Sequence, residues 1–148
     1  GPCLVRYPRG TATPGVQEPP LQLGKAHICR DGKRAAILAF GTTLNISESV
    51  AENLDLTLID MRFVKPLDTE LITELAARHK LLVTIEENAV AGGAGSAVNE
   101  YVVSQKLECQ LLNLGIPDLF IDQDEPANMR EVAGLTAANL ESKINSRL

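Results

Sequence analysis

The 148-residue chain contains no Trp and only two Tyr and three Phe, so its hydrophobic core must be built from aliphatic side chains. So few aromatic residues also weigh against binding of single-stranded nucleic acid, which depends on aromatic stacking. Positive charge is scarce too, because 14 Lys and Arg face 19 Asp and Glu, for a net charge of −5. Phosphate backbones are held by clustered Lys and Arg. The composition therefore excludes nucleic acid as an expected partner.

Long apolar runs are also missing. The longest have the length of a strand and fall far short of the roughly 20 residues that span a bilayer, so we expect no membrane partner. The three cysteines, Cys3, Cys29 and Cys109, form no CxxC or CxH pair. This spacing argues against a disulfide framework or a zinc site and favours reduced thiols in a cytoplasmic protein. His27 and His79 stand alone and are interpreted as surface or structural residues.

The amino-terminal part of the chain does not have the pattern of a folded domain. Residues 1–10 (GPCLVRYPRG) hold a short strand-like run that ends at Pro8 and Gly10. Residues 11–23 are rich in Pro and lack a hydrophobic period, as is typical of an extended linker. We therefore expect the last strand of a preceding domain at 1–10, a linker at 11–23 and a separate domain at 24–148.

Residues 24–148 alternate between strand-like and helix-like patterns. Strands are predicted at 26–29, 35–40, 56–60, 81–85 and 109–114, and helices at 44–54, 68–79, 96–105 and 136–148. This alternation predicts a three-layer α/β domain with a mixed, mostly parallel sheet. The Asp31-Gly32 pair between the first two runs is a typical hairpin turn and predicts a hairpin strand at one edge. Asp68 is the expected N-cap of the second helix.

Two segments around the strand at 81–85 could carry a function. The glycine cluster Gly92, Gly93 and Gly95 precedes a helix, where backbone N–H groups can receive an anion. It matches neither GxGxxG nor the P-loop, so a tight turn and close packing, with Ser96 as the helix cap, is the favoured interpretation. The run Glu86-Glu87-Asn88 follows the strand directly.

Consecutive residues leaving a strand point to opposite sides. Glu86 and Glu87 are therefore not expected to form an acid/base pair, and a hydrogen-bonding or interface role for one of them is favoured. The acidic stretch from Asp118 to Glu125 lacks the glycine and the terminal Glu of a calcium loop. No metal ligand is predicted.

Arg6 and Arg9 flank Tyr7 and Pro8 at the end of the first strand-like run. Guanidinium groups suit a bidentate grip on a phosphate, and a proline stiffens the turn that presents them. From the residues alone, a phosphate site and two ordinary surface arginines remain equal interpretations.

Four segments, taken in order, resemble the carboxy-terminal region of the 1-deoxyxylulose-5-phosphate synthase family. They are VRYPRG (5–10), DMRFVKPLD (60–68), TIEENAVAGGAGSAVNE (84–100) and LNLGIPDLFI (112–121). The wider transketolase superfamily, which includes the β subunits of 2-oxo acid dehydrogenases, shares only looser versions of them. The first two segments favour the synthases.

The resemblance implies a transketolase carboxy-terminal-like domain, with residues 1–10 as the last strand of the preceding pyrimidine-binding domain. Members of this family are homodimeric transferases of isoprenoid and thiamine biosynthesis. They condense pyruvate with glyceraldehyde 3-phosphate to give 1-deoxy-D-xylulose 5-phosphate and carbon dioxide. Thiamine diphosphate and magnesium are held by amino-terminal domains of the same chain, so the resemblance implies no cofactor site and no catalytic residue in these 148 residues.

One site residue is implied by the resemblance. Arg9 matches the position that binds the phosphate of the aldehyde substrate, and Arg6 is the second choice. The expectation is thus a carboxy-terminal fragment that supports domain packing, dimerisation and acceptor-phosphate binding and is inactive alone. Two alternatives stay open: a stand-alone, non-enzymatic α/β module for association or anion binding, and the corresponding domain of a 2-oxo acid dehydrogenase β subunit.

Overall fold

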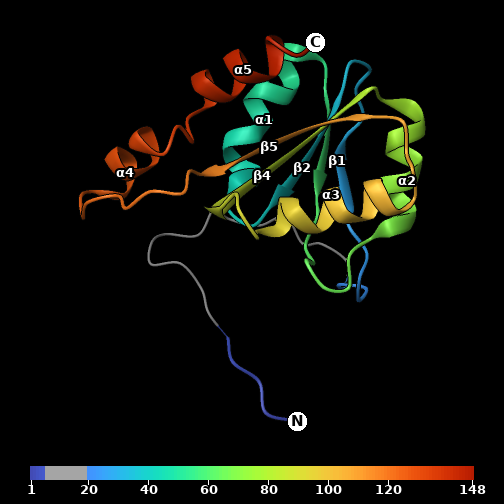
Figure 1. Cartoon of the computed structure of the whole chain (residues 1–148), viewed down its shortest axis with the longest axis horizontal. Helices are drawn as coiled ribbons and strands as arrows, with labels where there is room; N and C mark the ends of the chain where they lie inside the picture. The colour runs from blue at the N-terminus through green and yellow to red at the C-terminus, as the bar shows by residue number, and fades with distance from the viewer. Residues whose placement is uncertain (6–19) are drawn as a thin grey trace.

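The computed structural model describes residues 1–5 and 20–148, and every helix and strand that it describes lies after Gly24 (Figure 1). The elements follow in the order β1 (His27–Arg30), β2 (Ala36–Phe40), α1 (Thr43–Leu54), β3 (Thr57–Asp60), α2 (Thr69–Arg78), β4 (Leu81–Ala89), α3 (Ala94–Ser104), β5 (Gln110–Ile116), α4 (Pro126–Val132) and α5 (Ala137–Asn145). None of the described helices is long and apolar enough to cross a membrane.

The strands form one sheet in the order β1-β3-β2-β4-β5. β1 is antiparallel to β3, and all other neighbours are parallel. Parallel neighbours need a crossover connection, and here helices α1, α2 and α3 supply it. β2 lies in the middle of the sheet and all five of its residues are buried, as expected for a strand that is covered on both faces.

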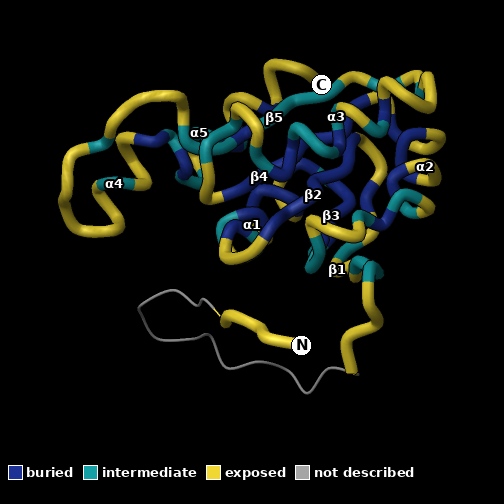
Figure 2. Tube along the Cα trace, turned by 60° about the horizontal axis from the view of Figure 1, so that its bottom comes forward, coloured by how far each residue is buried: buried dark blue, intermediate teal, exposed yellow. Residues whose placement is uncertain are grey.

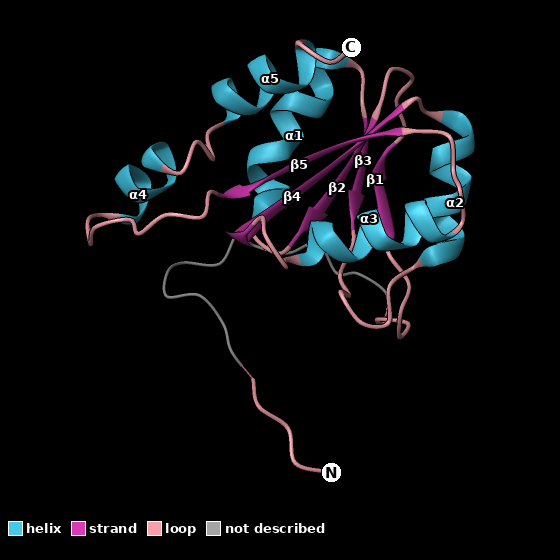
Figure 3. Ribbon diagram, viewed as in Figure 1, coloured by secondary structure: helices cyan, strands magenta, loops and turns pink. Residues whose placement is uncertain are grey.

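Helices cover both faces of the sheet, which gives the expected three layers (Figure 3). On one face, α1 and α5 pack over strand residues such as Ile37 and Val83. On the other, α2 and α3 pack over residues such as Leu38 and Leu82. Both cores are mainly aliphatic, and each fully buried side chain of this kind stabilises the fold by about 1.5–3 kcal/mol. Figure 2 shows this buried centre inside an exposed shell.

The fold class is therefore confirmed as a mixed, mostly parallel α/β sheet with helices on both faces. Asp68 is the N-cap of α2 as predicted, because its Oδ1 accepts a hydrogen bond from Leu71 N at 3.3 Å. β4 continues four residues beyond the predicted end and takes in Glu86, Glu87 and Asn88. The short helix α4 was not predicted, and none of its residues is buried.

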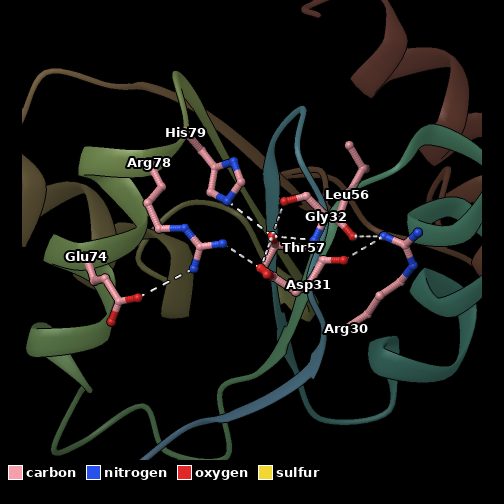
Figure 4. A network of polar contacts seen from close by, with 8 residues as sticks. All are labelled: Arg30, Asp31, Gly32, Leu56, Thr57, Glu74, Arg78 and His79. Carbon is pink, nitrogen blue, oxygen red and sulfur yellow. Dashed lines mark hydrogen bonds and ion pairs between the residues drawn. The ribbon is translucent and has the colours of Figure 1, made fainter.

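The predicted hairpin between the first two strands is wrong. β1 is an antiparallel edge strand, but it pairs with β3 and not with β2. The cause lies at Asp31-Gly32, where Gly32 N donates to Thr57 Oγ1 at 3.0 Å and Arg30 Nη1 donates to Leu56 O at 2.8 Å (Figure 4). These contacts hold the connection against the start of β3, which is inserted between β1 and β2.

The amino-terminal predictions remain untested. Residues 1–5 form no helix or strand and are exposed. The rest of the predicted strand, with Arg6 and Arg9, and all but the last residues of the linker lie outside the described residues. The boundaries proposed at 1–10, 11–23 and 24–148 therefore stay predictions.

Candidate functional site

The carboxyl ends of β2 and β4 border a hollow of about 1010 Å³. The chain leaves β2 toward β3 on one side of the sheet and leaves β4 toward β5 on the other. This is a topological switch point, the place where open α/β sheets bind ligands. The hollow is lined by the last residues of these two strands and the residues that follow them, by α3 and by one residue of another loop: Phe40, Gly41, Thr42, Val64, Glu86, Glu87, Asn88, Gly92, Gly93, Ala94, Ser96, Ala97 and Glu100.

Glu86 links the hollow to the start of α3. Its side chain is only 4% exposed. The carboxylate accepts hydrogen bonds from Ala94 N at 2.7 Å and from Gly95 N at 2.8 Å. Both donors belong to the first turn of α3, whose N–H groups have no partner within the helix. The partial positive charge of the helix end also favours a carboxylate there.

This contact decides between the interpretations of the glycine cluster. The anion-receiving end of α3 is already filled by Glu86, so the N–H groups of Ala94 and Gly95 are not free for an external anion. The favoured interpretation, close packing, is supported: a Cβ on Gly93 would overlap Ala89 O and the Glu86 carboxylate. Ser96, however, is not the cap. Its Oγ accepts from Gly92 N at 3.0 Å and so closes the preceding turn.

Gly95 packs against a chain of polar groups beneath α3. Asn113 on β5 donates through Nδ2 to Thr84 Oγ1 at 2.6 Å and accepts from Asn99 Nδ2 at 2.8 Å. A Cβ on Gly95 would stand 2.5 Å from both Asn113 Nδ2 and Thr84 Oγ1. The close approach of α3 to the sheet therefore requires a glycine at this position.

The side chain of Glu87 lies on the opposite face of β4 from that of Glu86, as the alternation of side chains along a strand requires. It is exposed, accepts a hydrogen bond from Thr42 Oγ1, and lies 3.8 Å from Arg130 of α4. The two carboxylates thus have separate partners and do not form an acid/base pair. Glu86 accepts its hydrogen bonds inside the protein, whereas Glu87 accepts its hydrogen bond at the surface.

The lining of the hollow determines which chemistry it suits. Among its described lining residues, three are Glu and none is Lys, Arg or His. Phe40, Val64 and Ala97 add apolar surface. Such a surface does not attract phosphate, and it suits a partner that carries positive charge beside apolar groups.

The described residues do not fit a magnesium site. Within 1–5 and 20–148, no group of three or more His, Cys, Asp or Glu side chains is arranged to hold a metal ion. A diphosphate-bound magnesium needs oxygen ligands at one point. The described residues offer no such set of ligands.

A second polar cluster lies at the opposite, amino end of the sheet (Figure 4). Thr57 Oγ1 contacts His79 Nε2 at 3.1 Å, and Arg78 contacts Asp31 Oδ1 at 2.5 Å. The hydrogen bond from Arg78 lowers the pKa of Asp31, and Asp31 in turn raises the pKa of Arg78. Burial lowers the pKa of His79, which is 4% exposed. The cluster joins the turn after β1 to β3 and to the end of α2, so its role is structural.

The sequence indicated the carboxyl edge of the sheet, meaning the carboxyl ends of its parallel strands, but it did not indicate several contacts there. Thr42, Asn113 and Arg130 were not singled out, although each binds a residue of the edge. Thr42 carried a local signal, because Gly41-Thr42-Thr43 directly follows a strand. Asn113 and Arg130 become neighbours of the edge only through the fold. Arg6 and Arg9, the predicted phosphate-binding residues, lie outside the described residues.

Comparisons with known proteins agree with this architecture. The family described as "Transketolase, C-terminal domain" matches residues 24–140. The 1-deoxy-D-xylulose-5-phosphate synthases of Yersinia pestis (strain Pestoides F) and Yersinia pseudotuberculosis serotype IB (strain PB1/+) are each 51% identical to the chain over 150 aligned positions. The alignment covers 100% of the chain and 24% of each relative, so the chain spans about a quarter of their length.

Solved structures show the same fold. A structure described as "Split gene transketolase, inactive beta4 tetramer" superposes with a TM-score of 0.79 at 30% identity, over 85% of this chain and 43% of that one. A 2-oxoglutarate:ferredoxin oxidoreductase from Magnetococcus marinus reaches a TM-score of 0.50 at 9% identity, over 82% of this chain and 19% of that one, a likeness of fold alone. The fold, the carboxyl edge and the match over residues 24–140 together establish that the chain belongs to the transketolase C-terminal domain family.

Proposed function

We propose that the chain is the carboxy-terminal domain of a thiamine-diphosphate-dependent transferase that condenses pyruvate with glyceraldehyde 3-phosphate to 1-deoxy-D-xylulose 5-phosphate and carbon dioxide. The observation that carries this proposal is the 51% identity to 1-deoxy-D-xylulose-5-phosphate synthases over the full length of the chain. The proposal places the protein in isoprenoid and thiamine biosynthesis in the cytoplasm. No specific observation favours either alternative, a stand-alone module or a 2-oxo acid dehydrogenase subunit.

In this proposal the domain supports the enzyme without holding its cofactor. The parent is a homodimer whose amino-terminal domains bind thiamine diphosphate and magnesium, while residues 24–148 pack against those domains. The 30% identical relative, a split-gene transketolase whose beta4 tetramer is inactive, supports this division of roles.

The test is an assay of the full-length product of the reading frame. Purified with thiamine diphosphate and magnesium, it should form 1-deoxy-D-xylulose 5-phosphate and release carbon dioxide only when pyruvate and glyceraldehyde 3-phosphate are both present. The proposed function would be refuted if the protein formed no 1-deoxy-D-xylulose 5-phosphate, or if it condensed pyruvate only with an acceptor other than glyceraldehyde 3-phosphate. The 148-residue chain, assayed beside it, should be inactive.

Arg9 is proposed to bind the phosphate of glyceraldehyde 3-phosphate. Loss of a charge-assisted and bidentate contact should cost about 2 to 4 kcal/mol of acceptor binding. In the full-length protein, Arg9→Ala should therefore raise the KM for glyceraldehyde 3-phosphate on the order of 30- to 700-fold. The KM for pyruvate should change little, because pyruvate has no phosphate.

Arg6→Ala in the same full-length protein is the matched control. A smaller effect on the acceptor KM, or an effect on stability alone, is expected. If both KM values rise together in the Arg9 variant, or if Arg6 is the stronger determinant, the assignment of Arg9 is wrong.

A further inference from the structure

An arm of the chain stands away from the body of the domain. It comprises residues 117–132, which include α4, and Figures 1 and 2 show it apart from the sheet and exposed along most of its length. Ile121 packs against the core near its beginning, and Ala133 is buried directly after its end. Between these two anchors no residue of α4 is buried.

The arm exposes large apolar side chains that its own domain does not cover. Phe120 has a relative exposure of 104%, Leu119 of 53% and Val132 of 65%. Single exposed apolar residues are ordinary, whereas three on one short arm indicate a surface for another protein. A fully exposed Phe is also a side chain that anchors interfaces well once it enters a pocket.

The arm contacts the hollow through one ion pair. Arg130 of α4 lies 3.8 Å from Glu87, which lines the hollow. This carboxyl-edge surface, defined as the arm together with the hollow residues, is strongly acidic. The arm carries five acidic residues and one basic residue, all exposed, and Glu87 and Glu100 are exposed in the hollow.

We propose that the carboxyl-edge surface docks a basic protein surface that surrounds an apolar pocket, and that this surface belongs to the remaining three quarters of the parent enzyme. The proposal rests on the proposed function, and two observations select this occupant. Charge complementarity favours a basic partner and disfavours a second copy of this chain, whose net charge is −5. The curated relatives are also about four times as long as the chain, since it covers 24% of them.

The test compares amide hydrogen exchange in the full-length protein and in the 148-residue chain at low concentration. We expect the amides of residues 118–125 to exchange at least about tenfold more slowly in the full-length protein, because docking removes them from solvent. Equal exchange in the two proteins would refute the proposed surface. Slow exchange that appears in the 148-residue chain when it is concentrated would identify a second copy as the occupant and would also refute it.

Two matched pairs of variants in the full-length protein test the chemistry of the partner. Phe120→Ala should abolish most of the slowing of amide exchange at residues 118–125. Val103→Ala, at a side chain on α3 that is 73% exposed, should not. Glu100→Lys should also accelerate exchange in the arm, while Glu52→Lys on α1 should leave it unchanged. A charge reversal at Glu100 without effect would show that the partner is not basic there. The amides of β2 report in the same experiment whether each variant is folded.

Synthase assays on the same preparations separate this inference from the proposed function. A full-length protein that forms product while its arm exchanges freely would refute the docking surface and leave the function in place. An arm that is protected in a protein without synthase activity would refute the function and support the surface.

Discussion

Glu86 connects the end of a central strand to the start of a helix, and this single carboxylate organises the carboxyl edge. Because it is buried, it must be matched by donors inside the protein, and the two N–H groups of α3 supply them. Its neighbour Glu87 is exposed and has partners of a different kind. The two adjacent residues should therefore differ strongly in how much they contribute to stability.

Replacing Glu86 tests this difference. Glu86→Ala should lower the free energy of unfolding by about 2 to 4 kcal/mol, since it removes two charge-assisted hydrogen bonds and leaves two N–H donors without a partner. Glu87→Ala, the adjacent control, should cost less than about 1 kcal/mol because its ion pair is solvent-exposed. Chemical denaturation measures both. Equal losses of unfolding free energy for the two variants would show that the contact of Glu86 with α3 contributes no more to stability than the surface contacts of Glu87.

His79 is expected to make the stability of the domain depend on pH, with a sign that follows from its burial. Burial lowers its folded-state pKa below the ordinary value of 6.5, the neighbouring Arg78 charge adds to the lowering, and Asp31 opposes it. The unfolded chain therefore binds a proton at a pH where the folded chain does not. The stabilisation is complete above about pH 6.5 and is lost as the pH falls below it.

The measurement is the free energy of unfolding between pH 7.5 and 5.5 for the wild type and for His79→Gln. The wild type should lose stability more steeply, by up to about 1.4 kcal/mol per pH unit. His27 is present in both proteins and is therefore common to both curves. Parallel curves would mean that His79 protonates as easily in the folded chain as in the unfolded one.

At the scale of the elements, most of the fold could be predicted because its signals are local. The buried runs of β2, β3 and β4, the helical period of α2 and its Asp68 cap are all patterns within a few residues. The pairing of β1 could not be predicted in this way. Asp31-Gly32 has the composition of a hairpin turn, but its hydrogen bonds go to Thr57, which only the tertiary structure brings near.

The candidate site, too, could be predicted only where its signals are local in sequence. Glu86 and the glycine cluster were located from sequence because a strand end followed by glycines and a helix is a local pattern. The residue that caps α3 could not be predicted, because the Glu86 carboxylate from β4 takes the capping role that was predicted for Ser96. The link between Glu87 and Arg130 joins residues that are 43 positions apart in sequence, and no short-range pattern indicates it.

The close packing of α3 on the sheet gives a further prediction at this scale. An alanine in a helix is usually about 1 kcal/mol more favourable than glycine. At position 95, however, the new Cβ would meet Asn113 Nδ2 and Thr84 Oγ1 at 2.5 Å, so Gly95→Ala should destabilise the domain by about 1 to 3 kcal/mol. Ser49→Ala, on the exposed face of α1, should be neutral or slightly stabilising. A thermal scan in which Gly95→Ala raises Tm would contradict the packing described for α3.

At the scale of the whole molecule, the domain combines a well-packed sheet with a carboxyl-edge surface that its own residues leave exposed. The hollow at the switch point has the position of a ligand site, but its lining is acidic and its helix end is filled by Glu86. These features are consistent with the proposed role of this chain as one domain of a larger enzyme.

Calorimetric titration with thiamine diphosphate and magnesium tests this central claim most directly, when the 148-residue chain and the full-length protein are compared under the same conditions. The full-length protein should bind the cofactor saturably, with one site per chain, and the 148-residue chain should give only heats of dilution. Saturable binding of thiamine diphosphate by the 148-residue chain would contradict the claim.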